Sequence, residues 1–108
     1  MLIDHRTYRI KPGQMNQHLA LYEEHGLKAQ WKHLGEPHVY MFAESGAMNS
    51  LVHQWVYKDA ADRAARRAEM MKDPDWLKYV KLLGDSGFLT EQQTSLMVPA
   101  KFMPPIKR

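Results

Sequence analysis

The stretch Ser50–Met71, SLVHQWVYKDAADRAARRAEMM, changes its hydrophobic period halfway along and constrains the fold more than any other part of the chain. Its first part alternates as a β-strand does, with His53, Trp55 and Tyr57 on one side. The residues after Tyr57 have the spacing of a helix, with alanines three and four positions apart. This order predicts a sheet whose strands are connected through covering helices.

The same two periods assign the rest of the chain. The turn KPG closes the first strand, and Gly35 and Pro37 end the first helical region. Gly26 lies inside that region and predicts a bend, because glycine weakens a helix interior. The predicted elements are a strand at 2–10, a helix at 14–35, strands at 38–44 and 51–57, a helix broken at DPDW (73–76), and a strand at 88–98.

The broken second helix carries clear boundary signals. Asp59 is a predicted N-cap, and Asp73 is another, with Pro74 in the first turn after it. We expect the alanine face to lie close against the sheet, because small side chains allow a close approach, and Trp76 and Val80 to belong to a buried stripe. The alanine face consists of Ala61, Ala64, Ala65 and Ala68, followed by Met71, and the buried stripe ends at Leu83.

The order β-α-β-β-α-β predicts an α+β, ferredoxin-like fold. Right-handed crossovers then favour one four-stranded antiparallel sheet with both helices on one face and with the first and third strands in the centre. A chain of 108 residues suits one domain. We expect residues 100–108, AKFMPPIKR, to form an irregular arm that could lie on a neighbouring subunit.

Composition narrows the classes of function. The chain has no cysteine, which excludes disulfides and thiolate chemistry, and it has no apolar run that predicts a membrane span or a signal segment. A net charge of +3 without a recognition motif does not indicate nucleic-acid binding. The six histidines lack metal-ligand spacing, so we expect no metal and no cofactor. We expect a cytoplasmic protein.

Two helices can cover only one face of the sheet. We expect them to take the slimmer row of Val52, Gln54 and Val56, which leaves the row with His53 and Trp55 facing away. An exposed aromatic row is uncommon in monomers. The sequence therefore predicts a homodimer in which a second copy covers this row or encloses a cavity beside it.

Polar residues of the neighbouring strands could line the same cavity. Asp4, Arg6 and Tyr8 share one side of the first strand, although alternation alone does not say which side that is. The last strand offers Gln92 and Thr94, whose alternative is an ordinary polar edge strand exposed to solvent.

Six short motifs run in order along the chain. They are RTYRIKPG (6–13), HLG (33–35), ESGAMNSLVHQWVYKD (44–59), DRAARRA (62–68), DPDW (73–76) and LMVPAKF (96–102). Together they resemble the NIPSNAP family, whose members belong to the dimeric α/β-barrel group of ferredoxin-like proteins. The resemblance implies two chains that close their sheets into a barrel, with Arg6 and Tyr8 on the same inward side as His53. Val39 and Tyr40 depart from the family, in which a glycine is common there.

Each candidate site residue has a functional and a structural interpretation. His53 is the candidate catalytic residue, as a general base, and its alternative is an interface histidine bonded to its neighbours. Arg6, Tyr8, Trp55, Tyr57 and Gln92 are the candidate substrate-binding residues. Their structural alternatives are aromatic packing for the two rings of the third strand and, for Arg6, an ion pair with Asp4, Glu91 or a residue of the partner chain.

The arginines of the second helix are a further candidate site. Arg63, Arg66 and Arg67 could form an anion patch, but we interpret them as a solvated helix face that pairs with Asp62 and Glu69. Their similarity to the arginines of the family suggests a structural role, such as clamping the third strand to the helix.

Two functions stay open at this point. In the first, the homodimer holds a small organic acid or aromatic molecule in its cavity, with or without cofactor-free chemistry such as proton transfer or monooxygenation. In the second, the chain is a non-enzymatic module that recruits another protein. The resemblance implies a wider barrel group that includes cofactor-free monooxygenases, dehydratases, cyclases, isomerases and longer haem enzymes, and the fold does not decide among functions.

Overall fold

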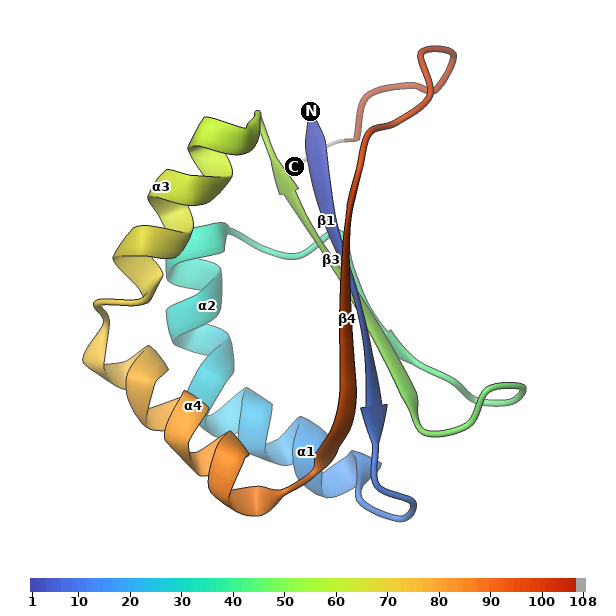
Figure 1. Cartoon of the computed structure of the whole chain (residues 1–108), viewed down its shortest axis with the longest axis vertical. Coiled ribbons are helices and arrows are strands. Elements are labelled where there is room, and N and C mark those ends of the chain that lie inside the picture. Colours follow the sequence, from blue (N-terminus) through green and yellow to red (C-terminus); the bar gives the residue numbers. More distant parts are fainter. Residues whose placement is uncertain (107–108) are drawn as a thin grey trace.

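The computed structural model describes residues 1–106, in which a four-stranded antiparallel sheet carries all the helices on one face (Figure 1). None of these helices is long and apolar enough to cross a bilayer. The elements are β1 (Leu2–Ile10), α1 (Met15–Leu21), a π-helical turn (Tyr22–Gly26), α2 (Leu27–Leu34), β2 (Val39–Phe42), β3 (Ser50–Tyr57), α3 (Ala60–Met70), α4 (Pro74–Ser86) and β4 (Leu89–Met97).

The strand order β2-β3-β1-β4 confirms the predicted ferredoxin-like topology, with the first and third strands in the centre. In the register, Arg6 of β1 lies opposite His53 of β3 and Thr94 of β4. Directly opposed residues share a face of the sheet. Asp4, Arg6 and Tyr8 are therefore on the same face as His53 and Trp55.

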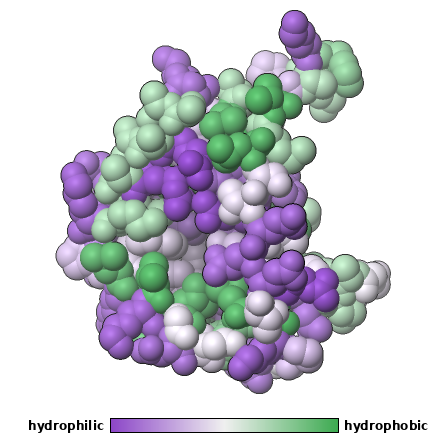
Figure 2. All heavy atoms as spheres, in the orientation of Figure 1, coloured by the Kyte–Doolittle hydropathy of each residue, from purple (hydrophilic) through white to green (hydrophobic). Residues whose placement is uncertain are grey.

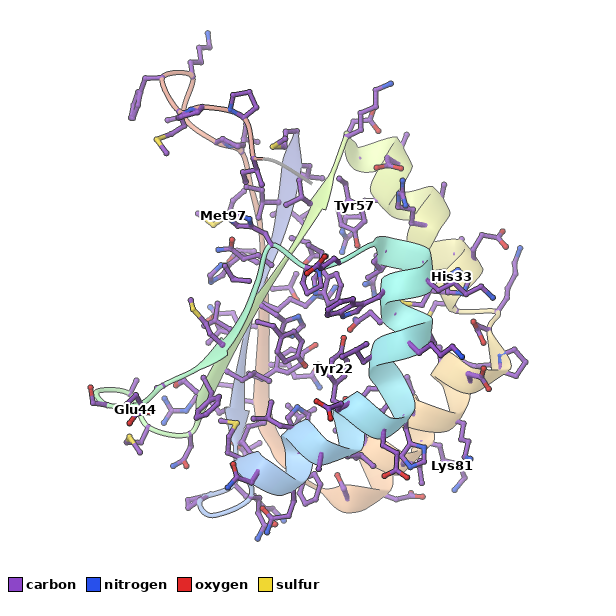
Figure 3. All side chains as sticks on the ribbon, turned by 180° about the vertical axis from the view of Figure 1, so that it is seen from behind. Tyr22, His33, Glu44, Tyr57, Lys81 and Met97 are labelled. Carbon is purple, nitrogen blue, oxygen red and sulfur yellow. The ribbon has the colours of Figure 1, made fainter. Side chains whose placement is uncertain are left out.

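That shared face lies under the helices, so the predicted orientation of the two rows is wrong. Trp55 and Tyr57 are each 1% exposed and belong to the core together with Tyr22, Met70 and Trp76 of the helical layer. Figure 3 shows Tyr22 and Tyr57 between the two layers and Met97 on the opposite side of the sheet. Large rings fill a wide space between sheet and helices, and burying them removes more apolar area from water than burying valines would.

The alanine face of α3 points to solvent, which corrects the expectation that it packs on the sheet. Ala61, Ala64, Ala65 and Ala68 are all exposed. The partly buried side chains of this helix are polar, including Arg63 and Arg67, and Met70 is fully buried. In α4, Val80 is 44% exposed, whereas Trp76 is buried as predicted. An arginine side chain can face the interior of a protein when a buried carboxylate pairs with it. The spacing of apolar residues along a helix does not predict such an inward arginine.

The helix boundaries follow the predicted capping residues. The Asp59 side chain accepts a hydrogen bond from the Asp62 backbone N–H, and Asp73 accepts one from Asp75. The bend predicted at Gly26 is the end of the π-helical turn. A Cβ atom at Gly26 would lie 2.9 Å from the ring of Tyr79, so only glycine lets α4 approach here. This close contact places Tyr22 and Tyr79 side by side in the core.

The chain ends in an arm of exposed residues after β4. A turn joins Ala100 to Met103, and Phe102 is 86% exposed. Figure 1 shows this arm standing out from the body of the molecule. The last two residues of the predicted arm, 107 and 108, lie outside the described residues.

Candidate functional site

A cavity of about 380 Å³ lies between the sheet and the helices, within one chain. Volumes of this order are typical of sites for small ligands. Figure 2 shows this side of the molecule, with hydrophilic side chains beside the opening and apolar side chains below it. The lining residues come from both layers and are Arg6, Tyr8, Tyr22, Gln30, Tyr40, His53, Arg67, Met71, Trp76, Tyr79, Val80, Leu83, Gly84, Gly87, Leu89 and Gln92.

A buried carboxylate organises one end of this cavity. Asp4 is fully buried and accepts two hydrogen bonds from Arg6, with Nε–Oδ1 at 2.9 Å and Nη2–Oδ2 at 3.1 Å. Arg63 of α3 donates to the same carboxylate, with Nε–Oδ2 at 3.0 Å. One side chain of the central strand β1 thus holds the cavity residue Arg6 in place and joins the sheet to α3.

The charged side chains at this end shift one another's pKa values. Burial alone would raise the pKa of the Asp4 carboxyl, but the hydrogen bonds and charges of Arg6 and Arg63 outweigh it and leave the pKa lowered. Burial lowers the pKa of the Arg67 guanidinium, and the nearby charge of Arg6 lowers it further. Asp4 is therefore an anion at neutral pH, with more than one cation around it.

His53 lies at the centre of the sheet, next to the cavity, and its protonation is set by Trp55. The Trp55 indole Nε1–H donates to His53 Nδ1 at 2.7 Å. Because an indole nitrogen can only donate, Nδ1 carries no proton and the neutral ring is protonated at Nε2. Among the described residues, Nε2 has no hydrogen-bond partner, although the side chain is buried. The ring of this lining residue therefore keeps an unused N–H donor.

The environment keeps this ring neutral. Burial lowers the pKa of His53 to about 3, and the charge of Arg6 contributes to the decrease. A general base at Nε2 would need that nitrogen without its proton. In this geometry the neutral ring is a hydrogen-bond donor at Nε2, and the general-base role of His53 stays a prediction.

Aromatic rings form one wall of the cavity. The Tyr40 ring stacks on His53 on one side and on Tyr22 on the other, with centroid distances of 4.8 Å in both cases. Tyr8 meets His53 edge to face, also at 4.8 Å. The Tyr22 hydroxyl donates to Gln30 Oε1 at 2.5 Å, which fixes the outer ring of the stack. Tyr40, the residue that departs from the usual family sequence, therefore reduces the space available to a ligand.

The buried tyrosines of this wall are weak acids. Burial raises the pKa of Tyr22, Tyr40 and Tyr79 above that of a free tyrosine. They are neutral at physiological pH and present hydroxyl groups instead of phenolates. The described lining also contains no aspartate or glutamate. At neutral pH, this lining offers hydrogen-bond donors and cations, but no base.

The predicted site residues divide into two groups. Arg6, Tyr8, His53 and Gln92 line the cavity. Trp55 and Tyr57 are not among the lining residues and are each 1% exposed in the core, so the structure does not bring them to the cavity with the other four. Arg6 makes the internal ion pair with Asp4 that was its structural alternative.

Sequence reasoning missed the contributions of the helices to the lining. The sequence patterns assign no site role to Tyr22 or Tyr79 and place Arg67 on a solvated helix face, whereas all three residues line the cavity. The positions Tyr22 and Tyr79 become adjacent only through the close approach at Gly26. Residues so far apart in sequence give no local signal that they meet.

Comparison with known proteins agrees with the motif resemblance. A family model described as NIPSNAP matches residues 3–104. The chain belongs to the NIPSNAP family. It is 32% identical over 96 residues to the Protein NipSnap homolog of Dictyostelium discoideum, and this match covers 89% of the chain and 41% of the relative. Human Protein NipSnap homolog 3A is also 32% identical over 96 residues, across 84% of the chain and 36% of the relative. The chain thus spans about two fifths of these NIPSNAP relatives.

Solved NIPSNAP structures have the same fold along nearly the whole chain. A protein from Agrobacterium tumefaciens is 38% identical with a TM-score of 0.87, over 96% of this chain and 98% of its own. A NIPSNAP domain protein from Burkholderia xenovorans is 32% identical with a TM-score of 0.89, and the match covers 97% of this chain and 100% of that protein's chain. A putative antibiotic biosynthesis monooxygenase from Nitrosomonas europaea is 11% identical with a TM-score of 0.65, over 92% and 98%, which shows a shared fold alone.

Replacing the buried carboxylate tests the organisation of the polar end. We expect Asp4→Asn to lower the free energy of unfolding by about 3 kcal/mol or more, because it leaves Arg6 and Arg63 without their shared counter-charge. Urea denaturation measures this change. The control is Asp85→Asn, which breaks an exposed pair with Lys81 and should cost less than about 1 kcal/mol. Equal effects of the two variants would contradict the role given to Asp4.

Proposed function

We propose that this NIPSNAP chain binds a compact organic molecule with a flat body in the cavity between sheet and helices. The observation that carries the proposal is the unpartnered Nε2–H of His53, which is buried beside a cavity walled by aromatic rings. A buried donor without a partner costs about 1–3 kcal/mol, and a bound acceptor would recover it. The tyrosine rings that line the cavity can pack edge to face against the body of a flat ligand.

The lining residues support ligand binding more than they support catalysis of proton transfer. A proton-transfer enzyme would need a base, and the described lining residues provide none at neutral pH. Donors such as His53 and Arg6 instead favour a ligand oxygen that is already negative or becomes so. Cofactor-free chemistry of the monooxygenase kind, as in the name of the Nitrosomonas neighbour, would therefore require a substrate that ionises without help.

We also propose that two copies associate through the face of the sheet that the helices leave bare. This face is a mixture of apolar and polar side chains, with Met41 53% and Met97 51% exposed. His5 at its centre is already bonded to Gln54, with Nδ1–Nε2 at 3.0 Å. An internally satisfied polar pair among apolar residues is suited to burial against a second copy.

Light scattering tests the association. We expect a particle of twice 12.6 kDa at micromolar concentration. Gln54→Glu should shift it toward the monomer, because a like charge would meet its own copy near a two-fold axis. A wild-type particle of 12.6 kDa would contradict the dimer, and the cavity within each chain would be unaffected.

A variant that fills the cavity tests the binding proposal. A Cβ atom at Gly84 of α4 would meet no atom within 4 Å, so Gly84→Leu should fold and occupy the cavity from its lining. Small flat probes such as phenol, benzamide and benzoate should raise the melting temperature of the wild type in a saturable way, because they bind only the folded state. We expect Gly84→Leu to abolish this rise.

The control is Lys81→Leu, which adds the same side chain to the exposed side of the same helix (Figure 3). It should respond to the probes as the wild type does. Equal responses of Gly84→Leu and the wild type would show that the probes bind elsewhere, and the proposed cavity function would be wrong. No response in any variant would favour the recruitment module instead.

A further inference from the structure

Three arginines, Arg6, Arg63 and Arg67, lie near the end of the cavity that Asp4 organises, and Asp4 bonds to two of them. Arg6 and Arg63 both bond to Asp4. Arg67 lies one turn beyond Arg63 on the same side of α3, lines the cavity and makes no ion pair with any described residue. Three guanidinium groups and one carboxylate leave two positive charges without a counter-charge.

The neighbouring Arg66 shows that this arrangement is particular to Arg67. Arg66 points to the other side of the helix, where its Nε donates to Asp62 Oδ1 at 2.8 Å. The three arginines predicted to form one solvated face thus have three separate roles. Arg63 clamps α3 to the sheet, Arg66 makes an exposed pair, and Arg67 faces the cavity.

The donors still free at this end differ between the arginines. Arg6 uses Nε and Nη2 on Asp4, so its remaining capacity is mainly Nη1. The Arg67 guanidinium makes no hydrogen bond to a described residue and keeps its whole planar fork for an oxyanion. A planar guanidinium fork matches the paired oxygens of a carboxylate or phosphate. The ring edges of the lining tyrosines offer an apolar surface for the rest of the molecule.

We propose that the ligand of this cavity carries a dianionic headgroup, a phosphate monoester or a dicarboxylate, which binds Arg67 with Arg6 beside it. The inference rests on the proposed function and adds the charge class of the ligand. A headgroup with two negative charges balances the excess of two positive charges of Arg6, Arg63 and Arg67 over Asp4, whereas a monoanion leaves one positive charge unbalanced at a partly buried site. The lining contains no carboxylate that would repel such a headgroup.

Isothermal titration calorimetry with a matched series of flat probes tests this proposal. The probes are phenyl phosphate, phthalate, benzoate and neutral benzamide, at constant ionic strength and about pH 8, well above the second phosphate pKa of about 6. The proteins are the wild type, Arg67→Met, Arg67→Lys and Arg66→Met. Arg66→Met is the control, because it removes the same charge from the outer side of the same helix.

For the wild type we expect the dianions to bind about tenfold more tightly than benzoate, and benzoate more tightly than benzamide. Arg67→Met should lose the preference for dianions, Arg67→Lys should keep part of it, and Arg66→Met should keep it entirely. Tighter binding of phenyl phosphate than of phthalate would identify the phosphate monoester, and the reverse order the dicarboxylate.

Two results would overturn the proposal in distinguishable ways. If benzamide binds as tightly as the dianions, or if Arg66→Met and Arg67→Met lose affinity equally, the charge class is wrong and the cavity function stands. If no probe binds the wild type, both the charge class and the proposed function fail. Circular dichroism of Arg67→Met establishes that a lost preference does not come from a lost fold.

Discussion

The structure depends on the burial of a single carboxylate in the central strand. Asp4 is fully buried, and it stays ionised because Arg6 from its own strand and Arg63 from α3 bond to it. An unpaired charge at this place would cost several kcal/mol, so the two arginines must lie inward with it. Asp4 and Arg6 lie on the face of the sheet that the helices cover, and the bond from Arg63 to Asp4 holds α3 beside β1. Because side chains alternate along a strand, Tyr8 of β1 and His53 of β3 lie on the same face as Asp4.

The sequence predicts the topology and the ends of the helices well, because the signals for these are local. Alternation identifies the strands, and Asp59, Asp73 and Gly26 act within a few residues of themselves. The face of the sheet that the helices cover is not determined by such local signals. Alternation separates two rows in β3 without saying which row faces the helices, and the choice made from side-chain size was wrong because the space between the layers is wide.

The candidate site was predicted in part for the same reason. The row that contains Arg6, Tyr8 and His53 was identified from strand parity and from the family resemblance, and these residues do line one cavity. The helical side of the lining needed three-dimensional contacts. Arg66 and Arg67 are adjacent and chemically identical, and only the rotation of α3 about its axis sends one to Asp62 and the other to the cavity. The Nε2–H tautomer of His53 likewise depends on the neighbouring indole.

The cavity combines features that favour an anionic, flat ligand over acid–base chemistry. Burial keeps His53 and the tyrosines neutral, so the charge of the site comes from its arginines. Tyr40 stacks between His53 and Tyr22 and occupies space at the position where the family commonly has glycine.

The ring of His53 reports most directly on whether this row lies in a helix-covered cavity. Long-range ¹⁵N–¹H correlation spectra, assigned by the loss of signals in His53→Asn, give its tautomer and its titration. The account predicts a neutral ring protonated at Nε2 that does not titrate between about pH 7 and pH 5, because its folded-state pKa is about 3. A ring that titrates near the ordinary value of about 6.5, or that carries its proton on Nδ1, would contradict it.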